Sequence, residues 1–386
     1  MSSTTAIIGG GAIGSAIACF HSVLREPGER IVVIERDPTY RFASSSLSAS
    51  SIRQQFSTPL NIRLSQFGYA FMSGCADGGV AGAAVGLHAR GYTFLARPDQ
   101  EAALRARTAL SRQHGAGVRE FDARALRAEY PWMQVDDLSY ATQGTAGEGW
   151  FDGYLLQQLY RARARAAGVE YVTGDVTDLV TRGSKVVSLA FADGRSMPVD
   201  RVVNAAGAWS AALARRVGVA LPVRARRRTV FILSCPTPFE RFPILIDPTG
   251  VFMRPEQRHF LAIVSPTDAD DADDLPLEPD LAQFEDAIWP VLAARVPAFE
   301  ALRVERAWAG YYEFNTIDHN GIVGQAGPDN HVVATGFTGH GLQHSAGIGR
   351  GVAELLATGG YRTLDLSPLA PQRFETGALI VEDAVV

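Results

Sequence analysis

The first 35 residues carry the pattern that most restricts how this chain can fold. An apolar segment at 4–8 precedes Gly9-x-Gly11-x-x-Gly14, a mixed segment follows to about Leu24, and a second apolar segment at 31–34 ends at Glu35. This order predicts strand, glycine turn, helix and a parallel strand that is buried on both faces. Such a turn lets a dinucleotide approach the backbone, the helix start attracts its pyrophosphate, and the acid accepts hydrogen bonds from ribose hydroxyls. The segment therefore predicts a Rossmann-type unit, although the glycines could instead serve close packing alone.

Composition removes several classes of protein. The chain has 386 residues, 47% of them hydrophobic and 20% charged, which is typical of a globular protein large enough for two domains. Its net charge of −5 disfavours a nucleic-acid partner. Cys19, Cys75 and Cys235 are far apart and disfavour a metal cluster or a disulfide framework. No apolar run reaches the ~20 residues of a membrane span and no secretory signal is visible, so we expect a cytoplasmic protein.

The remaining segments predict two interleaved domains. Strand and glycine-turn patterns return at 169–173, at 202–209 and after residue 304, whereas short strands are expected at 229–234, 250–254 and 259–265, with a helix at 281–294. We expect an α/β fold, α+β overall, with a Rossmann-type domain assembled from 1–80, 146–221 and 304–386. Residues 81–145 and 222–303 would form an antiparallel-sheet substrate domain. The basic run 224–228 is expected at a solvated strand end or domain interface, and the acidic stretch 268–274 in a solvated loop.

A second glycine turn lies near the other end of the chain. Gly336-Phe-Thr-Gly339-His340-Gly341-Leu-Gln343 joins an expected strand to an expected helix, whose unpaired N–H groups would attract negative charge. Together with the serines that follow Glu35 and the turn at 204–209, it suggests a cofactor that is gripped at both ends. These extra segments favour FAD over NAD, although an NAD-linked dehydrogenase stays an alternative. Glu35 disfavours the phosphorylated ribose of NADP. The predicted cofactor contacts are Gly9, Gly11, Ala12, Ile13, Gly14, Glu35, Arg36, Ser44, Ser45, Ser50, Ser51, Val176, Ala206, Gly207, Trp209, Gly339, His340, Gly341, Leu342 and Gln343.

Three motifs carry a family resemblance that spans essentially the whole chain. They are Ser48-Ala-Ser-Ser-Ile-Arg53-Gln-Gln-Phe56, Gly310-Tyr-Tyr-Glu-Phe-Asn315-Thr-Ile-Asp318-His-Asn320-Gly and the turn from Gly336 to Gln343. With them the chain resembles the D-amino-acid-oxidase superfamily of FAD enzymes, in its sarcosine and glycine oxidase branch. It looks most like the subgroup of complex I assembly FAD oxidoreductases and proline dehydrogenase β-subunits.

The resemblance implies a reaction. Members of the family oxidise amines, usually N-substituted amino acids, to imines that hydrolyse, and a hydride passes to flavin N5. Backbone N–H groups and the helix dipole at 339–343 would stabilise the charge of reduced flavin. Arg53 matches the arginine that holds the substrate carboxylate in sarcosine oxidases. Gln343 stands where that family has a second, cationic ligand, so a simple sarcosine-like substrate is not expected.

Other departures from the family refine the expectation. Tyr311 occupies the place of the cysteine that attaches flavin covalently in sarcosine oxidases, and residues 37–56 contain no histidine, so non-covalent FAD is expected. The strand 259–265 lacks the lysine that speeds the oxygen reaction, which favours a dehydrogenase over a fast oxidase. Either O2 or another electron acceptor remains open, as does an oligomer.

The candidate catalytic residues come from four parts of the chain. Tyr312, with Tyr311, Phe314, Phe252 and Met253, could form an apolar box that excludes water, and His340 could donate a hydrogen bond. His340 and His344 have helical spacing but no acidic partner nearby in sequence, so no metal site is expected. The full set is Arg53, Tyr312, His340, Gln343 and Arg254. A flavoprotein with an assembly or scaffolding role is the alternative to an enzyme.

Overall fold

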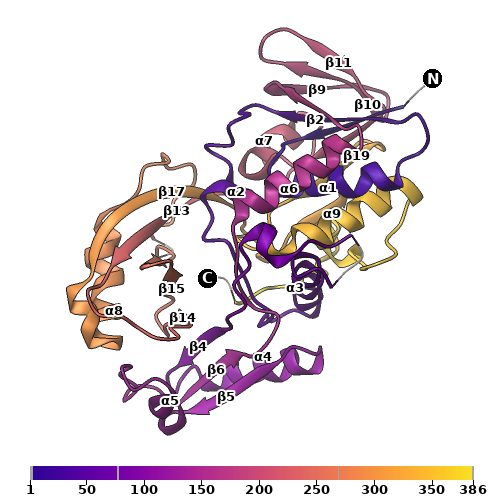
Figure 1. Cartoon of the computed structure of the whole chain (residues 1–386). Helices are drawn as coiled ribbons and strands as arrows, with labels where there is room; N and C mark the ends of the chain where they lie inside the picture. Colours follow the sequence, from indigo (N-terminus) through magenta and orange to yellow (C-terminus); the bar gives the residue numbers. More distant parts are fainter. Residues whose placement is uncertain (1–2, 76–77, 268, 385–386) are drawn as a thin grey trace.

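A mostly parallel six-stranded sheet forms one half of the molecule (Figure 1). The structure, a computed structural model, describes residues 3–75, 78–267 and 269–384. The strand order is β18-β19-β12-β1-β2-β8, and only β18, at the edge, runs antiparallel to its neighbour. The strands are β1 (Thr4–Ile8), β2 (Arg30–Glu35), β8 (Glu170–Thr173), β12 (Arg201–Asn204), β18 (Ile322–Gln325) and β19 (His331–Thr335). Because β1 lies between β2 and β12, the chain leaves it at a topological switch point, where such sheets bind ligands.

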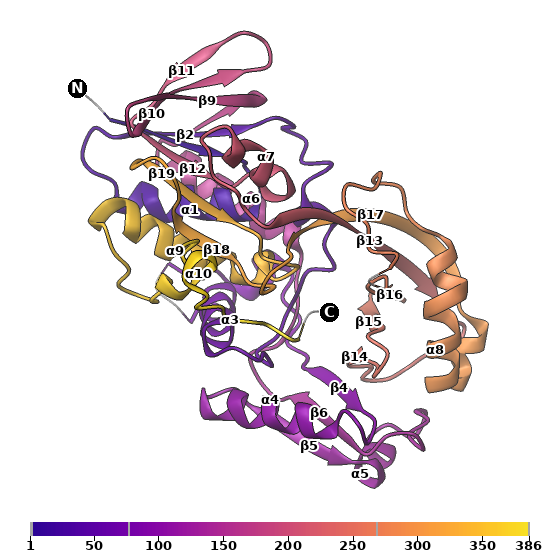
Figure 2. The same cartoon turned by 180° about the vertical axis from the view of Figure 1, so that it is seen from behind.

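Both faces of this sheet are covered, which explains its continuously apolar strands. On one face lie the helices α1 (Ala12–Leu24), α3 (Pro59–Met72), α6 (Gly153–Ala166) and α9 (Gly341–Thr358). On the other face lies a three-stranded antiparallel sheet made of β9 (Val176–Arg182), β10 (Lys185–Phe191) and β11 (Ser196–Pro198) (Figure 2). Alternate residues of β2 point to opposite faces, so Val33 packs with the helices and Val32 with the small sheet. Among the described residues, no helix has the length and apolar character needed to cross a bilayer.

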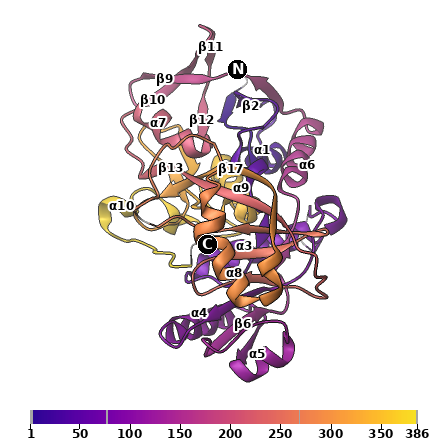
Figure 3. The ribbon, with the colours of Figure 1, turned by 90° about the vertical axis from the view of Figure 1, so that its left-hand side faces the viewer.

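The other half is built on a mixed eight-stranded sheet of order β17-β13-β16-β15-β14-β4-β6-β5. Its strands are β4 (Tyr92–Ala96), β5 (Val118–Asp122), β6 (Tyr140–Gly144), β13 (Val223–Ser234), β14 (Ile244–Ile246), β15 (Phe252–Glu256), β16 (His259–Ile263) and β17 (Arg303–Asn315). The long antiparallel pair β13 and β17 runs from the neighbourhood of the six-stranded sheet out to α8 (Trp289–Arg295), as Figures 1 and 3 show. The predicted α/β class, α+β overall, is confirmed. The domain boundaries stay a prediction. They assigned residues from 304 onward to the Rossmann-type domain, whereas β17 places residues 303–315 in the eight-stranded sheet.

The remaining elements are short, apart from α4. They are α2 (Ser44–Leu47), β3 (Ser51–Ile52), η1 (Gly82–Val85), α4 (Glu101–Gln113), α5 (Ala123–Glu129), β7 (Gly149–Trp150), η2 (Gly207–Trp209), α7 (Ser210–Arg215), η3 (Phe284–Ile288), η4 (Pro297–Ala301), η5 (Ser367–Leu369) and α10 (Arg373–Thr376). The helix expected at 281–294 is divided into the π-helical η3 and α8.

The two charged stretches of the sequence contact each other, which neither expectation included. Residues 224–228 lie within β13, and Arg228 is buried there. Its guanidinium donates to both carboxylate oxygens of Asp271, at 2.7 and 2.9 Å, and Arg226 pairs with Asp273 at 2.8 Å. A buried arginine needs such a partner, and neither residue order nor spacing indicated it. Asp268, part of the same acidic stretch, lies outside the described residues.

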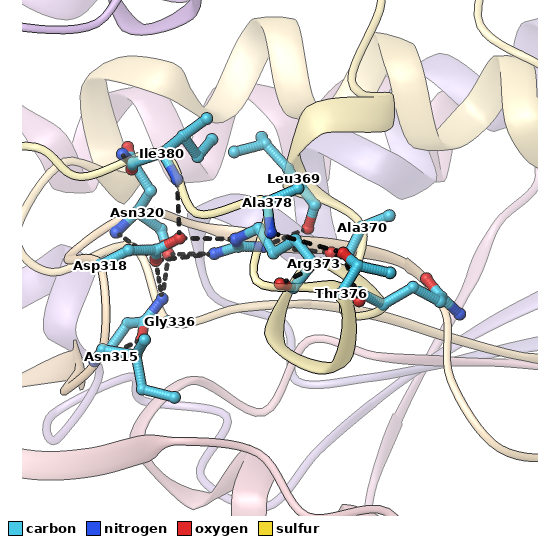
Figure 4. Close-up of polar contacts among 12 residues, drawn as sticks. Asn315, Asp318, Asn320, Gly336, Leu369, Ala370, Arg373, Thr376, Ala378 and Ile380 are labelled. Carbon is cyan, nitrogen blue, oxygen red and sulfur yellow. Dashed lines mark hydrogen bonds and ion pairs between the residues drawn. The ribbon is translucent and has the colours of Figure 1, made fainter.

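The chain after α9 is fastened to the turn between β17 and β18. Arg373, in α10, donates to both carboxylate oxygens of Asp318, at 2.7 and 2.9 Å, and both side chains are buried (Figure 4). Asn315 donates to the same carboxylate at 2.7 Å, and Asn320 donates to the carbonyl of Ile380. This cluster directs the last described residues back toward α3.

A buried carboxylate in the Rossmann-type unit makes the stability of the protein depend on pH. Glu29 accepts hydrogen bonds from Thr5 and His21, at 2.5 and 2.9 Å. Burial by itself would raise the pKa of Glu29, but His21, Thr5 and Arg201 lower it from 4.5 to about 2. Because the folded pKa is depressed, this stabilisation is present above about pH 4.5 and is lost as the pH falls toward 2.

We expect Glu29→Gln to lower the free energy of unfolding by roughly 2–3 kcal/mol at pH 7, and by much less at pH 3. Urea titrations at both pH values measure the difference. Glu26→Gln, which changes an exposed acid in the same turn, is the matched control and should change stability little. Equal destabilisation by Glu29→Gln at both pH values would show that its charge is not responsible.

Candidate functional site

A cavity opens where β1, β2 and β12 end. Segments far apart in the sequence line it together, and most of the predicted cofactor contacts are among them. Those in its lining are Gly9, Gly11, Ala12, Ile13, Glu35, Arg36, Ser44, Ser45, Val176, Ala206, Gly207, Trp209, Gly339, Gly341 and Leu342. This larger cavity therefore joins the first glycine turn, the serine stretch, the turn after β12 and the start of α9.

The first turn needs its glycines for two different reasons. Gly9 has φ +99°, and a Cβ there would lie 2.3 Å from the Ala205 carbonyl oxygen. Gly14 is not in the cavity lining; a Cβ on it would lie 1.9 Å from the Gly9 carbonyl oxygen. Gly9 thus shapes the cavity wall, whereas Gly14 lets α1 pack against the turn. The first-turn amides of α1 lack helical partners, and Ala12 and Ile13 of this turn line the cavity.

The acid at the end of β2 holds the turn in place. Glu35 accepts from the backbone N–H of Gly10 at 2.8 Å and from that of Asp37 at 3.0 Å. Each carboxylate oxygen can accept a further hydrogen bond, so the contact with Gly10 does not prevent contact with a ribose. Next to it the Arg36 guanidinium lies 3.7 Å from the centre of the Trp209 ring. Arg36 and Trp209, with Val176, make a flat, partly apolar end to the cavity.

Only part of the serine stretch reaches the larger cavity. Ser44 donates to the carbonyl of Tyr311 at 2.6 Å, and Ser45 Oγ is buried without a hydrogen-bond partner among the described residues. The Ser45 Oγ atom lies beside Gly11, at the amino end of α1. Ser50 and Ser51 instead line a smaller cavity next to the first.

The C-terminal turn closes the opposite end of the larger cavity. Gly339 has φ +84°, and a Cβ there would lie 2.5 Å from the Tyr312 ring, so only glycine lets this ring pack on the turn. α9 begins directly afterwards at Gly341, with its amino end toward the cavity. Glu313 also lines the cavity and accepts from Thr335 Oγ1 at 2.9 Å and Gly336 N–H at 3.1 Å. Burial raises the pKa of Glu313 to about 7 despite these hydrogen bonds.

The smaller cavity adjoins the larger one and contains four of the five candidate catalytic residues. Arg53, Tyr312, His340 and Gln343 line it, together with Tyr92 and Phe252. Tyr312, Gly339 and Leu342 belong to the walls of both cavities. A ligand in the smaller cavity would therefore lie against whatever fills this end of the larger one.

Arg53 is a buried cation held by several groups. Its guanidinium lies 3.9 Å from the centre of the Phe56 ring and donates to the carbonyls of Gln55 and Ala384. Its backbone N–H donates to Gln343 Oε1 at 3.0 Å. Burial lowers the pKa of Arg53, and the nearby Glu382 carboxylate is the largest opposing influence. Gln343 thus fixes the position of Arg53 through the backbone rather than adding a second charge.

The two histidines of the C-terminal turn are buried and neutral. Burial holds the pKa values of His340 and His344 well below the usual 6.5, and Arg53 lowers them further. His340 Nε2 lies 3.4 Å from Arg53 Nη2, and His344 Nε2 lies 3.1 Å from Ser65 Oγ. Within the part of the chain that is described, no group of three or more His, Cys, Asp or Glu side chains is arranged for a metal ion.

Arg254 is the candidate that the structure does not bring to the site. It is absent from the lining of both cavities, donates to the Ala49 carbonyl at 2.8 and 3.1 Å, and pairs with Glu256 at 2.6 Å. Sequence reasoning also missed Arg228, Tyr92 and Glu313 as lining residues. Glu313 lies inside a motif that had been singled out, whereas the strands of Arg228 and Tyr92 offered no such signal.

The described residues fit a long dinucleotide cofactor. Ser45 Oγ lacks a partner beside the amino end of α1, where a pyrophosphate would accept from both. Two helix starts face one cavity, and Glu35 keeps free acceptor sites for a ribose.

Comparisons with known proteins agree with this fit. Residues 4–355 match the DAO family model, described as FAD dependent oxidoreductase. The protein named FAD-dependent oxidoreductase domain-containing protein 1 is 36% identical in Xenopus laevis, with 98% of this chain and 84% of that protein covered. The Bos taurus protein of that name is 35% identical, with 100% and 87% covered.

Solved structures share the fold. L-proline dehydrogenase from P. horikoshii superposes with a TM-score of 0.83 at 22% identity, covering 98% of this chain and 99% of that one. Glycine oxidase from Geobacillus kaustophilus gives 0.79 at 22% identity, covering 96% and 98%. The predicted cofactor, FAD, and the predicted family are thus confirmed: the chain belongs to the DAO family of FAD-dependent oxidoreductases.

Proposed function

We propose that this protein oxidises a secondary amino acid, or a related N-substituted amine, to an imine that then hydrolyses in water. The observation that carries the proposal is the position of Arg53, a buried cation in a small cavity that shares Tyr312, Gly339 and Leu342 with the cofactor cavity. An arginine there can grip a carboxylate while the neighbouring amine carbon lies at the shared wall. Solved structures with this fold include enzymes named for proline and iminodiacetate, both secondary amines.

FAD bound in the larger cavity would supply the hydride acceptor, N5 of its flavin ring. We propose that the protein holds FAD without a covalent bond, since neither cysteine nor histidine is among the described residues that line this cavity. The first-turn amides of α1, with Ser45, would hold the pyrophosphate, and Glu35 a ribose. The amino end of α9 would stabilise negative charge at the other end of the cofactor.

The chain's own groups favour a substrate whose amine is neutral. Tyr92, Phe252 and Tyr312 place aromatic rings in the wall of the smaller cavity beside the Arg53 cation, and both the rings and the neighbouring positive charge disfavour an ammonium group. Burial keeps His340 uncharged and raises the pKa of Tyr92 to about 12, so neither is a strong base at neutral pH. Arg53 would bind and orient the substrate, while loss of the amine proton to solvent would precede oxidation.

We propose an electron acceptor other than O2 as the main partner, because β16 has no lysine at 259–263. We also propose a cytoplasmic location and no nucleic-acid partner. The proposal is compatible with either a monomer or an oligomer. An assembly role is the outcome left if no amine reduces the bound flavin.

Ser45 offers a test of cofactor binding. We expect Ser45→Ala to raise the dissociation constant for FAD about tenfold, because it removes one hydrogen bond to a charged phosphate. Titration of apoprotein, followed by flavin fluorescence, measures this. Ser46→Ala is the matched control, since Ser46 Oγ is also buried without a partner but does not line the cavity. Equal effects of both variants would contradict the placement of the pyrophosphate beside Ser45. Acid precipitation tests the non-covalent attachment separately: all FAD should stay in the supernatant.

Arg53 offers a test of substrate binding. We expect Arg53→Gln to lower kcat/KM for an N-alkyl amino acid by at least about 100-fold, since each charge-assisted contact is worth ~1.5–3 kcal/mol and two are lost. Arg53→Lys keeps the charge but loses the planar guanidinium that donates two parallel hydrogen bonds. Its kcat/KM should therefore lie between those of Arg53→Gln and the original protein. The same amine without its carboxylate should be oxidised equally by both variants and the original protein. A loss that is as large for that amine would contradict the role.

The pH dependence tests the neutral-amine requirement. We expect the rate of anaerobic flavin reduction to rise with pH, with a midpoint that follows the pKa of the substrate amine. Two substrates of different amine pKa, mixed with the protein in a stopped-flow instrument, should give two midpoints. His340→Asn should leave both midpoints in place, because the imidazole is already neutral. One midpoint for both substrates would instead indicate a titrating group of the protein.

A further inference from the structure

The last described residues of the chain reach Arg53. The segment 380–384, called here the C-terminal segment, follows α10 and lies beside α3 (Figures 1 and 2). The Ala384 carbonyl accepts a hydrogen bond from Arg53 Nη2, although the two residues are 331 positions apart. Ala384 and Glu382 are both buried. The segment is therefore part of the surroundings of the residue that we propose to bind the substrate.

Glu382 fastens this segment. Its carboxylate accepts five hydrogen bonds, from Ser57 N–H and Oγ, Thr58 Oγ1, Asn61 Nδ2 and the N–H of Ala384, at 2.7–3.1 Å. The N–H of Glu382 donates to the carbonyl of Asp318 at 3.0 Å, next to the Arg373 ion pair shown in Figure 4. Burial alone would raise the pKa of Glu382, but Arg53 and the hydrogen bonds lower it, so the carboxylate stays charged.

Competition for Arg53 follows from the shape of its guanidinium. A carboxylate can receive two parallel N–H bonds either from Nη1 and Nη2 or from Nε and Nη2, so both arrangements use Nη2. Nη2 carries two hydrogens, and two acceptors lie beside it: the Ala384 carbonyl and His340 Nε2, the latter at 3.4 Å. Nη1 already donates to Gln55. A two-bonded carboxylate therefore needs one acceptor of Nη2 to withdraw.

Of the two acceptors, Ala384 is the one that can withdraw. His340 is buried at the start of α9 beneath the Phe56 ring, with ring centres 5.1 Å apart. Ala384 belongs to a segment with no helix or strand, and Asp383 beside it is exposed. The Glu382 side chain and the Ile380 carbonyl hold the earlier part of the segment. Its end is held by hydrogen bonds from the N–H groups of Asp383 and Ala384, so Ala384 can move when these two open while the segment stays attached.

We propose that the C-terminal segment competes with the substrate carboxylate for Arg53: its Ala384 carbonyl occupies Arg53 Nη2 in the free protein and withdraws when a carboxylate binds. Glu382 contributes by holding the segment in place and by opposing a second anion near Arg53. The inference rests on the proposed function, since it takes Arg53 as the carboxylate ligand.

The test measures carboxylate affinity in the FAD-loaded protein. Benzoate is titrated and its binding is followed by the change in the flavin absorption spectrum, with benzamide as the uncharged probe of equal shape. We expect Glu382→Gln, and separately a chain that ends at an amidated Glu382, to lower the dissociation constant for benzoate about tenfold. The first removes a negative charge near Arg53 and loosens the segment, and the second removes the Ala384 carbonyl without adding a terminal carboxylate. Benzamide affinity should stay the same.

Two controls separate the possible failures. Asp383→Asn removes a neighbouring, exposed acid and should leave benzoate affinity unchanged. The chain that ends at Glu382 keeps the contacts of Glu382 with Ser57, Thr58 and Asn61, so it tests competition even if Glu382→Gln fails to fold. Unchanged or weaker benzoate binding in this shortened chain overturns the proposal.

Arg53→Gln distinguishes this inference from the proposed function. If Arg53→Gln abolishes benzoate binding while the segment variants bind as the original protein does, only the competition is wrong. If benzoate binds equally well to Arg53→Gln, the carboxylate ligand is misassigned and both proposals fall.

Hydrogen exchange observes the withdrawal directly. The N–H of Asp383 donates to Ser57 Oγ at 2.9 Å, and that of Ala384 to Glu382 at 3.1 Å. We expect both amides to exchange several-fold faster when benzoate binds, and at an unchanged rate with benzamide. Slower or equal exchange in the presence of benzoate contradicts the withdrawal.

Discussion

The close packing of α1 against α9 is the constraint on which the site depends. A Cβ on Gly349 would lie 2.7 Å from the Cβ of Ala16, so small residues let the two helices approach closely. Each helix begins at a glycine turn, and each turn lines the same cavity. Their partial positive charges therefore converge on one space, at a separation set by helix packing rather than by mobile loops. A cofactor with a pyrophosphate and a ring that becomes negative on reduction suits this arrangement.

Two buried arginines are balanced by carboxylates, because an isolated charge in the interior is costly. Arg228 pairs with Asp271 and Arg373 with Asp318, and each pair joins segments that are distant in sequence. Arg53 differs, because its contacts are carbonyls and aromatic rings, and Glu382 is the carboxylate that most opposes the lowering of its pKa by burial. Such a cation keeps an attraction for an incoming anion, which is the property that a carboxylate-binding site requires.

Local rules predicted much of the cofactor cavity. Gly9 and Gly11, followed by a helix and by Glu35, form a unit in which every requirement acts within about 30 residues. The same holds for the turn before α9. Arg254 shows where this reasoning stopped, since its strand was expected but the contacts of its side chain with Ala49 depend on a segment 205 residues away. The pairing of the basic run with the acidic stretch was not predicted for the same reason, because spacing carries no information on partners that are distant in sequence.

The sequence by itself determined the order of strand, turn and helix, the sites that only glycine can occupy, and the kind of cofactor that such turns accept. Periodicity and backbone sterics act between near neighbours, so they can be read along the chain. Packing decided which side chains meet: that Gln343 positions Arg53 through its backbone, that Tyr312 separates two cavities, and that Glu382 returns to α3. These contacts join residues hundreds of positions apart, and they exist only because burial and charge balance are satisfied over the whole fold.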